Sequence, residues 1–363
     1  MKWFPVLVAA CLGGNLHAHA QPDEHAVPTE MCRGYFMVPL TLSADDGRPE
    51  ERTLWFLHDT GATTTYVDPD SLERVAGHRI DSTRVRIRNA TAGPVTYHSL
   101  RARVTDLDHL SRSLGREIDG VLAYDAFGDR LLILDYESEQ IRIRDGRLPP
   151  PDGQTIFDAD GPDKRPWLQM HFPGRTRRML IDSGAAQTVL AINDIDRYPT
   201  VEAPRAVGAA MRFRTVEPRS GARLDGQVRM GPHRLERPTL QSTPGSELIG
   251  GRIMRYFTWT FDPVQDRVQI VRNDLPAAIA FDPIYGHGMI LAPNDIGLRV
   301  AGVLAGAPAE RAGIQVGDVV THFNGEPLIS RDCDANPGAD LLVTLLRAGD
   351  RIDVLIDVET LVD

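Results

Sequence analysis

Cysteine is scarce in this chain. Its 363 residues include 3 cysteines, and only Cys32 and Cys333 lie beyond the first twenty positions. Two cysteines this far apart leave open either one disulfide between the ends of the chain or two free thiols, and the sequence favours free thiols. A disulfide-rich scaffold is excluded.

Lysine is rarer still, with Lys2 and Lys164 alone, so the basic charge is almost entirely arginine. The formal net charge of −10 argues against a nucleic-acid partner. Beyond the first twenty residues, no stretch approaches the roughly 18 consecutive apolar residues that a membrane-spanning helix needs. The 11 histidines are scattered without metal-ligand spacing. No Gly-x-Ser-x-Gly elbow or glycine-rich phosphate loop occurs, so neither a metal nor a cofactor is predicted.

One short string occurs twice. The sequence reads Leu-His-Asp-Thr-Gly-Ala-Thr at 57–63 and Ile-Asp-Ser-Gly-Ala-Ala-Gln at 181–187, which sets Asp59 and Asp182 123 positions apart. Hydrolysis of an amide can use two facing carboxyl groups that share a proton: one activates water while the other protonates the carbonyl oxygen. Each copy would supply one of the two.

The surroundings of the string are repeated as well. Each copy follows an apolar alternation that predicts a β-hairpin, at 35–57 and 167–181, whose second strand leads to the aspartate. Each is followed by a short apolar segment, at 119–125 and 247–251, and by further strands at 131–143 and 257–270. A repeat of this length predicts two similar lobes rather than a solenoid, whose periods are about 20–50 residues.

Asp-Thr/Ser-Gly followed by two apolar residues and a glycine resembles the aspartic peptidases, and the lobe size is nearer to the retroviral type. With the C-terminal segment, the chain is most similar to bacterial retropepsin-like or pepsin-like aspartyl proteases fused to a PDZ domain. The resemblance implies a mainly β fold, with two retropepsin-like β-barrel lobes in one chain, related by a pseudo-twofold axis, and a C-terminal PDZ domain. It implies that Asp59 and Asp182 are catalytic. The loops would be supported by Thr60, Gly61, Ser183 and Gly184, the glycines allowing a sharp turn under each carboxyl group.

Three features depart from the family pattern. Ala123 stands where a glycine is expected, and this is tolerable if its φ is negative. His58 precedes the first aspartate; we expect it to pack behind the site, with tuning of Asp59 as the alternative. No residue stands out as a flap residue; the 84–97 segment is the candidate flap, with Tyr97 as a weak candidate.

The pattern changes near residue 280. A strand at 288–291, a strand at 297–304, a short helix begun near Pro308 and closed by Gly313, and an Asn-Gly turn at 324–325 together resemble a PDZ domain. A second helix is expected at 339–347 and a last strand at 352–356. PDZ domains bind extended peptide C-termini by strand addition. The resemblance places peptide binding at Gly288, Met289 and Ile290, and a PDZ-like fold that only supports the lobes is the alternative.

The first twenty residues, with Ala-His-Ala at 18–20, have the composition of a secretory signal peptide. We therefore expect residues 1–20 to be a signal, 30–149 and 150–273 to be the two lobes, and 280–360 to be the PDZ domain. The protein is expected to be exported, to the periplasm or the extracellular space.

These observations predict an exported aspartic-type endopeptidase that acts on protein or peptide substrates, with PDZ-mediated recognition of peptide ends. The alternative is a catalytically degenerate peptidase scaffold that binds peptides, and a third hypothesis is a structural pseudo-enzyme without peptide affinity.

Overall fold

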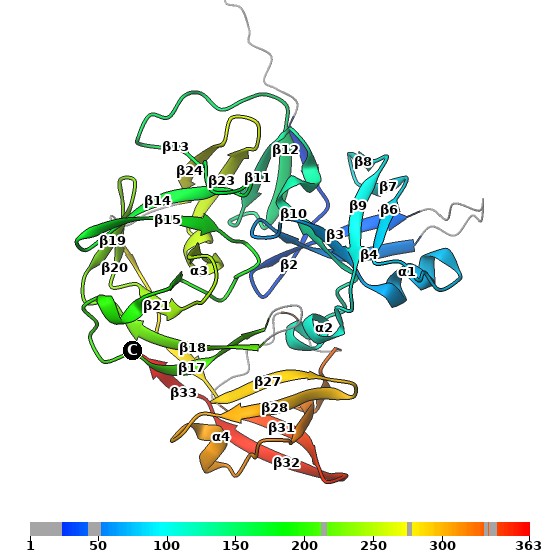
Figure 1. Ribbon diagram of the computed structural model, residues 1–363, viewed down its shortest axis with the longest axis vertical. Helices are drawn as coiled ribbons and strands as arrows, with labels where there is room; N and C mark the ends of the chain where they lie inside the picture. The colour runs from blue at the N-terminus through cyan, green and yellow to red at the C-terminus, as the bar shows by residue number, and fades with distance from the viewer. Residues whose placement is uncertain (1–23, 43–51, 212–215, 274–277, 330–332, 334–339) are drawn as a thin grey trace, which may run out of the picture.

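The computed structural model describes residues 24–42, 52–211, 216–273, 278–329, 333 and 340–363. This part of the chain is mainly β, with short helices and barrel-like sheets, as the sequence predicts (Figure 1). The finer prediction of retropepsin-like lobes stays a prediction. The predicted signal peptide lies outside the described residues.

The first half of the chain is organised around the hairpin of β3 (Tyr35–Leu42) and β4 (Arg52–Asp59), which pair antiparallel as predicted. β10 (Gly120–Ala123) runs parallel to β4 and brings Ala123 beside Asp59. The same sheet also contains β2 (Glu30–Cys32), β5 (Thr65–Val67), β6 (Arg84–Ile87), β7 (Ala90–Ala92), β8 (Val95–Tyr97) and β9 (Leu100–Val104), with α1 (Pro69–Ala76), α2 (Asp108–Leu114) and a 3-10 turn at Tyr124–Phe127 between strands.

The second half repeats this arrangement. β14 (Trp167–Phe172) and β15 (Arg175–Ile181) form the hairpin, and β22 (Leu248–Ile249) runs parallel to β15. Each aspartate therefore lies at the end of a strand that has a parallel neighbour. The sheet also contains β16 (Leu190–Ile192), β17 (Arg205–Met211), β18 (Val216–Arg223), β19 (Gln227–Met230), β20 (His233–Glu236), β21 (Thr239–Ser242) and β25 (Ala278–Ala280), with α3 (Gly251–Met254) and a 3-10 turn at Ile195–Arg197 nearby.

The two halves also share a sheet. Leu134 pairs with Trp259 across its middle, so strands from both halves are hydrogen-bonded to each other. The predicted boundary between 30–149 and 150–273 remains a prediction about folding units, because this sheet joins them. Its strands are β1 (Glu24–Val27), β11 (Leu131–Asp135), β12 (Gln140–Arg144), β13 (Ile156–Asp158), β23 (Phe257–Asp262) and β24 (Arg267–Arg272).

The C-terminal module follows the predicted order except at one element. The helix expected at 339–347 is wrong: β31 (Asp340–Arg347) pairs with a strand on each side. Leu341, Val343 and Leu345 are buried at every second position, which satisfies a strand; the same leucines also fit a helical stripe. The module contains β27 (Met289–Asn294), β28 (Gly297–Val303), α4 (Pro308–Arg311), β29 (Val319–Phe323), β30 (Glu326–Pro327) and β32 (Asp350–Asp357), and a separate pair is formed by β26 (Ile284–Gly286) and β33 (Glu359–Val362).

Cys32 and Cys333 are bonded, so the preference for free thiols is wrong. Their Cα atoms lie 5.0 Å apart although 301 positions separate them in sequence. Cys32 is buried with Leu57 and Ala62 in an apolar cluster of the first half, and Cys333 packs against this cluster. The 301 positions that separate the two cysteines in sequence had given no sign of this contact, which forms only in the folded chain.

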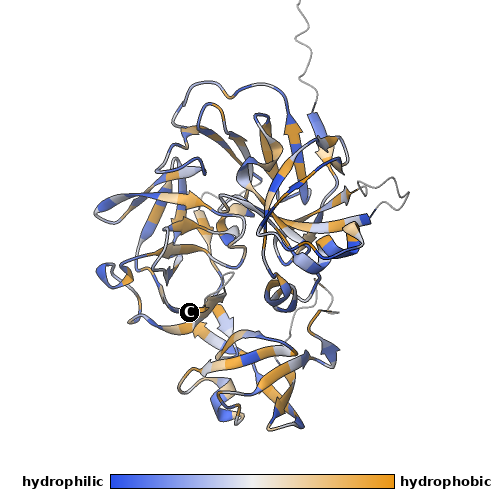
Figure 2. Cartoon of the chain, turned by 45° about the vertical axis from the view of Figure 1, so that its right-hand side comes forward, coloured by the Kyte–Doolittle hydropathy of each residue, from blue (hydrophilic) through white to orange (hydrophobic). Residues whose placement is uncertain are grey.

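Apolar residues concentrate on the strands of the lobes (Figure 2). A single core runs through both halves, and Trp259, Phe36 and Phe56 are among its largest fully buried side chains. The C-terminal module has a separate core around Val300, Val320 and Val343. The carboxyl pair is therefore positioned by one continuous core, against which a second body is packed.

Candidate active site

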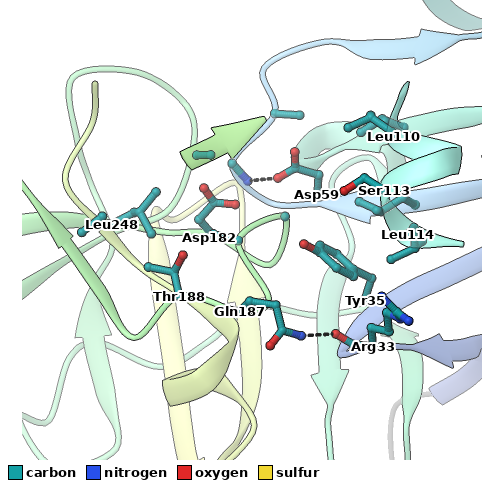
Figure 3. Close-up of a pocket in the computed structure, with 18 of the residues that line it drawn as sticks. Arg33, Tyr35, Asp59, Leu110, Ser113, Leu114, Asp182, Gln187, Thr188 and Leu248 are labelled. Atoms are coloured by element: carbon teal, nitrogen blue, oxygen red, sulfur yellow. Dashed lines mark hydrogen bonds between the residues drawn. The ribbon is translucent and has the colours of Figure 1, made fainter. Parts of the chain in front are cut away.

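Asp59 and Asp182 meet between the two halves. Asp59 ends β4, and Asp182 follows β15, where its N–H donates to the carbonyl of Ile249 (3.0 Å). The carboxyl groups of Asp59 and Asp182 face each other (Figure 3). The structure thus brings the predicted pair together; its catalytic role stays a prediction.

Gly61 and Gly184 are needed for space. Neither has a positive φ, so the expected reason, a turn that only glycine can make, is wrong. A Cβ atom on Gly61 would lie 2.6 Å from Cγ of Asp182, and one on Gly184 would lie 2.4 Å from Cγ of Asp59. Each glycine therefore leaves room for the carboxyl group of the opposite half.

Thr60 and Ser183 bind the two loops together with reciprocal, buried hydrogen bonds. The Thr60 N–H donates to Ser183 Oγ (3.0 Å), and the Ser183 N–H donates to Thr60 Oγ1 (2.9 Å). Each hydroxyl then donates to a carbonyl of the other half, Thr60 to Ile181 (2.8 Å) and Ser183 to His58 (3.1 Å). This network fixes the separation of the carboxyl groups, and it gives Thr60 and Ser183 the predicted supporting position.

Burial raises the pKa of Asp59. Donation from the N–H of Gly61 (2.7 Å to Oδ1), the hydrogen bond with Asp182, the N–H of Ala62 and the charge of Arg165 offset part of that rise. Two facing carboxyl groups cannot both ionise cheaply, so the proton affinity of each depends on the charge of the other.

The structure accommodates two of the departures from the family pattern, His58 and Ala123. His58 is fully buried, its ring lies 5.4 Å from that of Phe127, and burial lowers its pKa to about 3. It packs behind the site as a neutral ring, as expected. Ala123 has φ −71°, so its side chain fits, whereas a Cβ on Gly250 would lie 2.2 Å from the Thr188 carbonyl oxygen.

A cavity of about 720 Å³ opens beside the pair. Tyr35 lines it, and Figure 3 shows its hydroxyl directed toward Asp182. Burial and the nearby charges of Asp182 and Asp59 raise the Tyr35 pKa to about 12, so it remains a hydrogen-bond donor. Sequence reasoning missed Tyr35 because it opens an ordinary strand. It also missed Gln187, whose amide donates to the Arg33 carbonyl (2.8 Å) and links the halves.

The flap prediction at 84–97 is wrong. Tyr97 is buried in the core of the first half and does not line the cavity. Val207, Ala209 and Ala210 of β17 line it instead. The internal repeat is the signal that could have found these residues. It suggests looking for a cavity-lining hairpin in the second half as well as in the first, and β17 and β18 form such a hairpin.

The predicted peptide-binding residues of the C-terminal module lie near the same cavity. Met289 lines it, together with His287 and Leu291. Gly288 has φ +84°, and Ile290 pairs with Gly302 on β28.

In the described ranges, no cluster of three or more His, Cys, Asp or Glu has a metal-binding arrangement. None of the described helices is long and apolar enough to cross a bilayer.

Comparison with known proteins assigns one part of the chain. A family model described as PDZ domain matches residues 299–335. A protein named "Probable periplasmic serine endoprotease DegP-like", from Rhizobium meliloti (strain 1021), is 42% identical over 101 residues, which is 26% of this chain and 18% of that protein. A crystal structure of a PDZ domain protein from Parabacteroides distasonis ATCC 8503 is 18% identical over 22% of this chain and 21% of that one, with a TM-score of 0.20, too low to support an argument.

These findings confirm the PDZ domain, and a PDZ domain indicates peptide binding. They do not support the resemblance to aspartyl proteases. The prediction of an aspartic-type endopeptidase with PDZ-mediated recognition is contradicted, because the curated relative is named a serine endoprotease. The chain spans only 18% of the length of that relative. The predicted absence of a nucleic-acid partner stays a prediction.

Proposed function

We propose that the protein is a peptidase hydrolase in which Asp59 and Asp182 act on the water that attacks the scissile bond. The observation that supports this most is their geometry: two half-buried carboxyl groups from two equivalent loops, facing each other beside a cavity. The name of the curated relative supports the peptidase class. A match of 101 residues cannot contain both Asp59 and Asp182, which are 123 positions apart, so it assigns no role to the pair.

The chemistry uses the single proton of the pair. The ionised carboxylate takes a proton from water as the water oxygen bonds to the carbonyl carbon, and the neutral carboxyl group donates its proton to the carbonyl oxygen. The tetrahedral intermediate then collapses and the C–N bond breaks: the group that took the water proton gives it to the amine nitrogen, and the other group takes a proton from a hydroxyl of the intermediate, which restores the one-proton pair. Tyr35 donates a hydrogen bond toward the reacting centre. The rigid Thr60–Ser183 network holds both carboxyl groups in place.

The remaining features fit an exported peptidase. A disulfide between Cys32 and Cys333 is typical of proteins from oxidising compartments, which supports export to the periplasm or beyond. We propose that peptide chains, including their C-termini, bind at the 288–290 segment of the PDZ domain. The proposed units are a signal at 1–20, lobes at 30–149 and 150–273, and the PDZ domain at 280–360.

The test is to replace each carboxyl group alone, as Asp59→Asn and Asp182→Asn, in the full chain. Each should lower the hydrolysis of an unfolded, fluorescently labelled protein at least about a thousandfold, because neither amide can replace the acid or the base. The melting temperature should not fall. Asp125→Asn, at an exposed position of the first half, is the matched control and should retain full activity.

Activity that survives in either Asn variant would overturn the proposal. If that activity is also lost on treatment with a serine-directed fluorophosphonate, the chain hydrolyses through a serine, as the name of the relative states.

A further inference from the structure

The cavity beside the carboxyl pair has a third wall, which neither lobe supplies. His287, Met289 and Leu291 of the C-terminal module line the cavity that also contains Asp59 and Asp182. β27 lies against β17 and against α2, so the module contacts both halves at the edge of the cavity (Figure 1).

This wall completes an apolar region of the cavity. Met289 and Leu291 lie on β27, on either side of an irregularity between Ile290 and Leu291, and both line the cavity. Around them, the facing elements also contribute apolar side chains. These are Leu110 and Leu114 from α2, and Val207, Ala209 and Ala210 from β17.

The wall is held firmly from behind. Gly288 has φ +84°, and a Cβ there would lie 2.2 Å from Cβ of Ala307, so the backbone is pressed against the start of α4. The Met289 N–H donates to His287 Nδ1 (3.0 Å), and the His287 carbonyl accepts from the Ala309 N–H (2.9 Å). A wall fixed in this way is formed before any ligand arrives.

Met289 and Leu291 differ in how freely they can meet a ligand. Met289 is 5% exposed and belongs to the module's core, whereas Leu291 is only partly buried against that core. Leu291 can therefore contact a side chain in the cavity while Met289 supports it.

We propose that Leu291 and Met289, with β17 and α2, form a subsite for an apolar side chain of the peptide that is bound at Asp59 and Asp182. This deepens the proposed function and rests on it. The C-terminal module then acts as a specificity-determining wall of the reacting cavity, continuous with the carboxyl pair. A peptide carrying leucine near its scissile bond would be preferred over one carrying serine, because only the leucine would bury apolar surface there.

The experiment uses two fluorogenic peptide sets that are identical except for leucine or serine at one position, with the position moved stepwise along either side of the scissile bond. Wild-type protein should prefer leucine about tenfold in kcat/KM at one position of the series. Leu291→Ala should reduce that preference severalfold. Leu291→Glu should abolish it and improve turnover of a lysine-bearing peptide. Ala209→Leu should reduce it from the opposite wall, by filling the space.

Leu355→Ala is the matched control, because Leu355 is a 61% exposed leucine of the same module and does not line the cavity. It should leave the preference unchanged. A melting curve for each variant separates lost specificity from lost folding. Equal preference in wild type, Leu291→Ala and Ala209→Leu, all folded, would overturn the inference while leaving the carboxyl pair untouched.

A binding measurement separates this inference from the proposed function. In the Asp59→Asn background, fluorescence anisotropy should still show tighter binding of the leucine peptide than of the serine peptide. Adding Leu291→Glu should remove that difference. Discrimination in binding without hydrolysis by the wild type would contradict the proposed function alone; hydrolysis without any discrimination would contradict the subsite alone.

Discussion

The loops around Asp59 and Asp182 come from the two halves of one chain, and they correspond residue by residue at the center. Thr60 in one half and Ser183 in the other each accept from the partner's N–H and donate to a carbonyl across the interface. Gly61 and Gly184 each make room for the opposite carboxyl group. Where the two carboxyl groups face each other, the structures of the two halves agree.

Away from that center the halves differ. Ala123 ends β10 and Gly250 follows the equivalent strand β22, but only Gly250 has no room for a side chain, and His58 stands where the second half has Ile181. β17 lines the cavity, whereas Tyr97 of the first half lies in the core. The comparison teaches that the two halves are alike where they position the carboxyl groups and differ in the packing behind the site and in the walls of the cavity.

The largest effect should come from making Gly250 resemble Ala123. Gly250→Ala places a methyl group 2.2 Å from the Thr188 carbonyl oxygen, so the backbone must move, at a cost of about 3 kcal/mol in the free energy of unfolding. The reverse change, Ala123→Gly, should cost only about 1 kcal/mol, through chain entropy. Urea denaturation of both variants measures the difference, and equal costs would show that the halves are equally permissive there.

A smaller effect is expected from breaking the shared network on each side. Thr60→Val keeps the shape but removes the donor to Ile181 and the acceptor for Ser183, which should cost about 2 kcal/mol. Ser183→Ala removes the mirror-image pair of bonds and should cost about as much. Both should also slow hydrolysis. If one variant is destabilised and the other is not, the two sides of the network have the same geometry but contribute unequally to the free energy of unfolding.

The sequence predicted this central part well because a repeated string is visible without knowledge of the fold. The repeat paired Asp59 with Asp182. The hairpins that carry them were predicted because the alternation of apolar residues along a strand is a local pattern. It failed where a non-local contact leaves no repeated pattern in the sequence. The bond between Cys32 and Cys333 is such a contact.

The C-terminal module shows the same limit in another form. The leucines at 340–347 suit a helix as well as a strand, and pairing with β29 and β32 decides for the strand. That Leu291 reaches the cavity follows from how two bodies pack, which no local pattern records.

The smallest effect on stability at neutral pH is expected from His58, and this effect increases as the pH falls. Burial lowers the pKa of His58 in the folded protein to about 3, while an unfolded histidine titrates near 6.5. The unfolded state therefore binds a proton that the folded state refuses, so His58 costs stability as the pH falls from about 6.5 toward 3. The raised pKa of Asp59 acts in the opposite direction, because the folded pair binds a proton more readily than the unfolded chain.

Giving the first half the residue of the second, as His58→Ile, isolates the histidine. Its unfolding free energy relative to wild type should rise by about 1.4 kcal/mol for each pH unit between 6 and 4, since only the wild type must hold a neutral ring against protonation. Chemical denaturation at a series of pH values measures this slope. His78→Gln, at an exposed position, is the control and should follow the wild-type curve. Parallel curves for His58→Ile and wild type would mean that the asymmetry behind Asp59 carries no pH dependence.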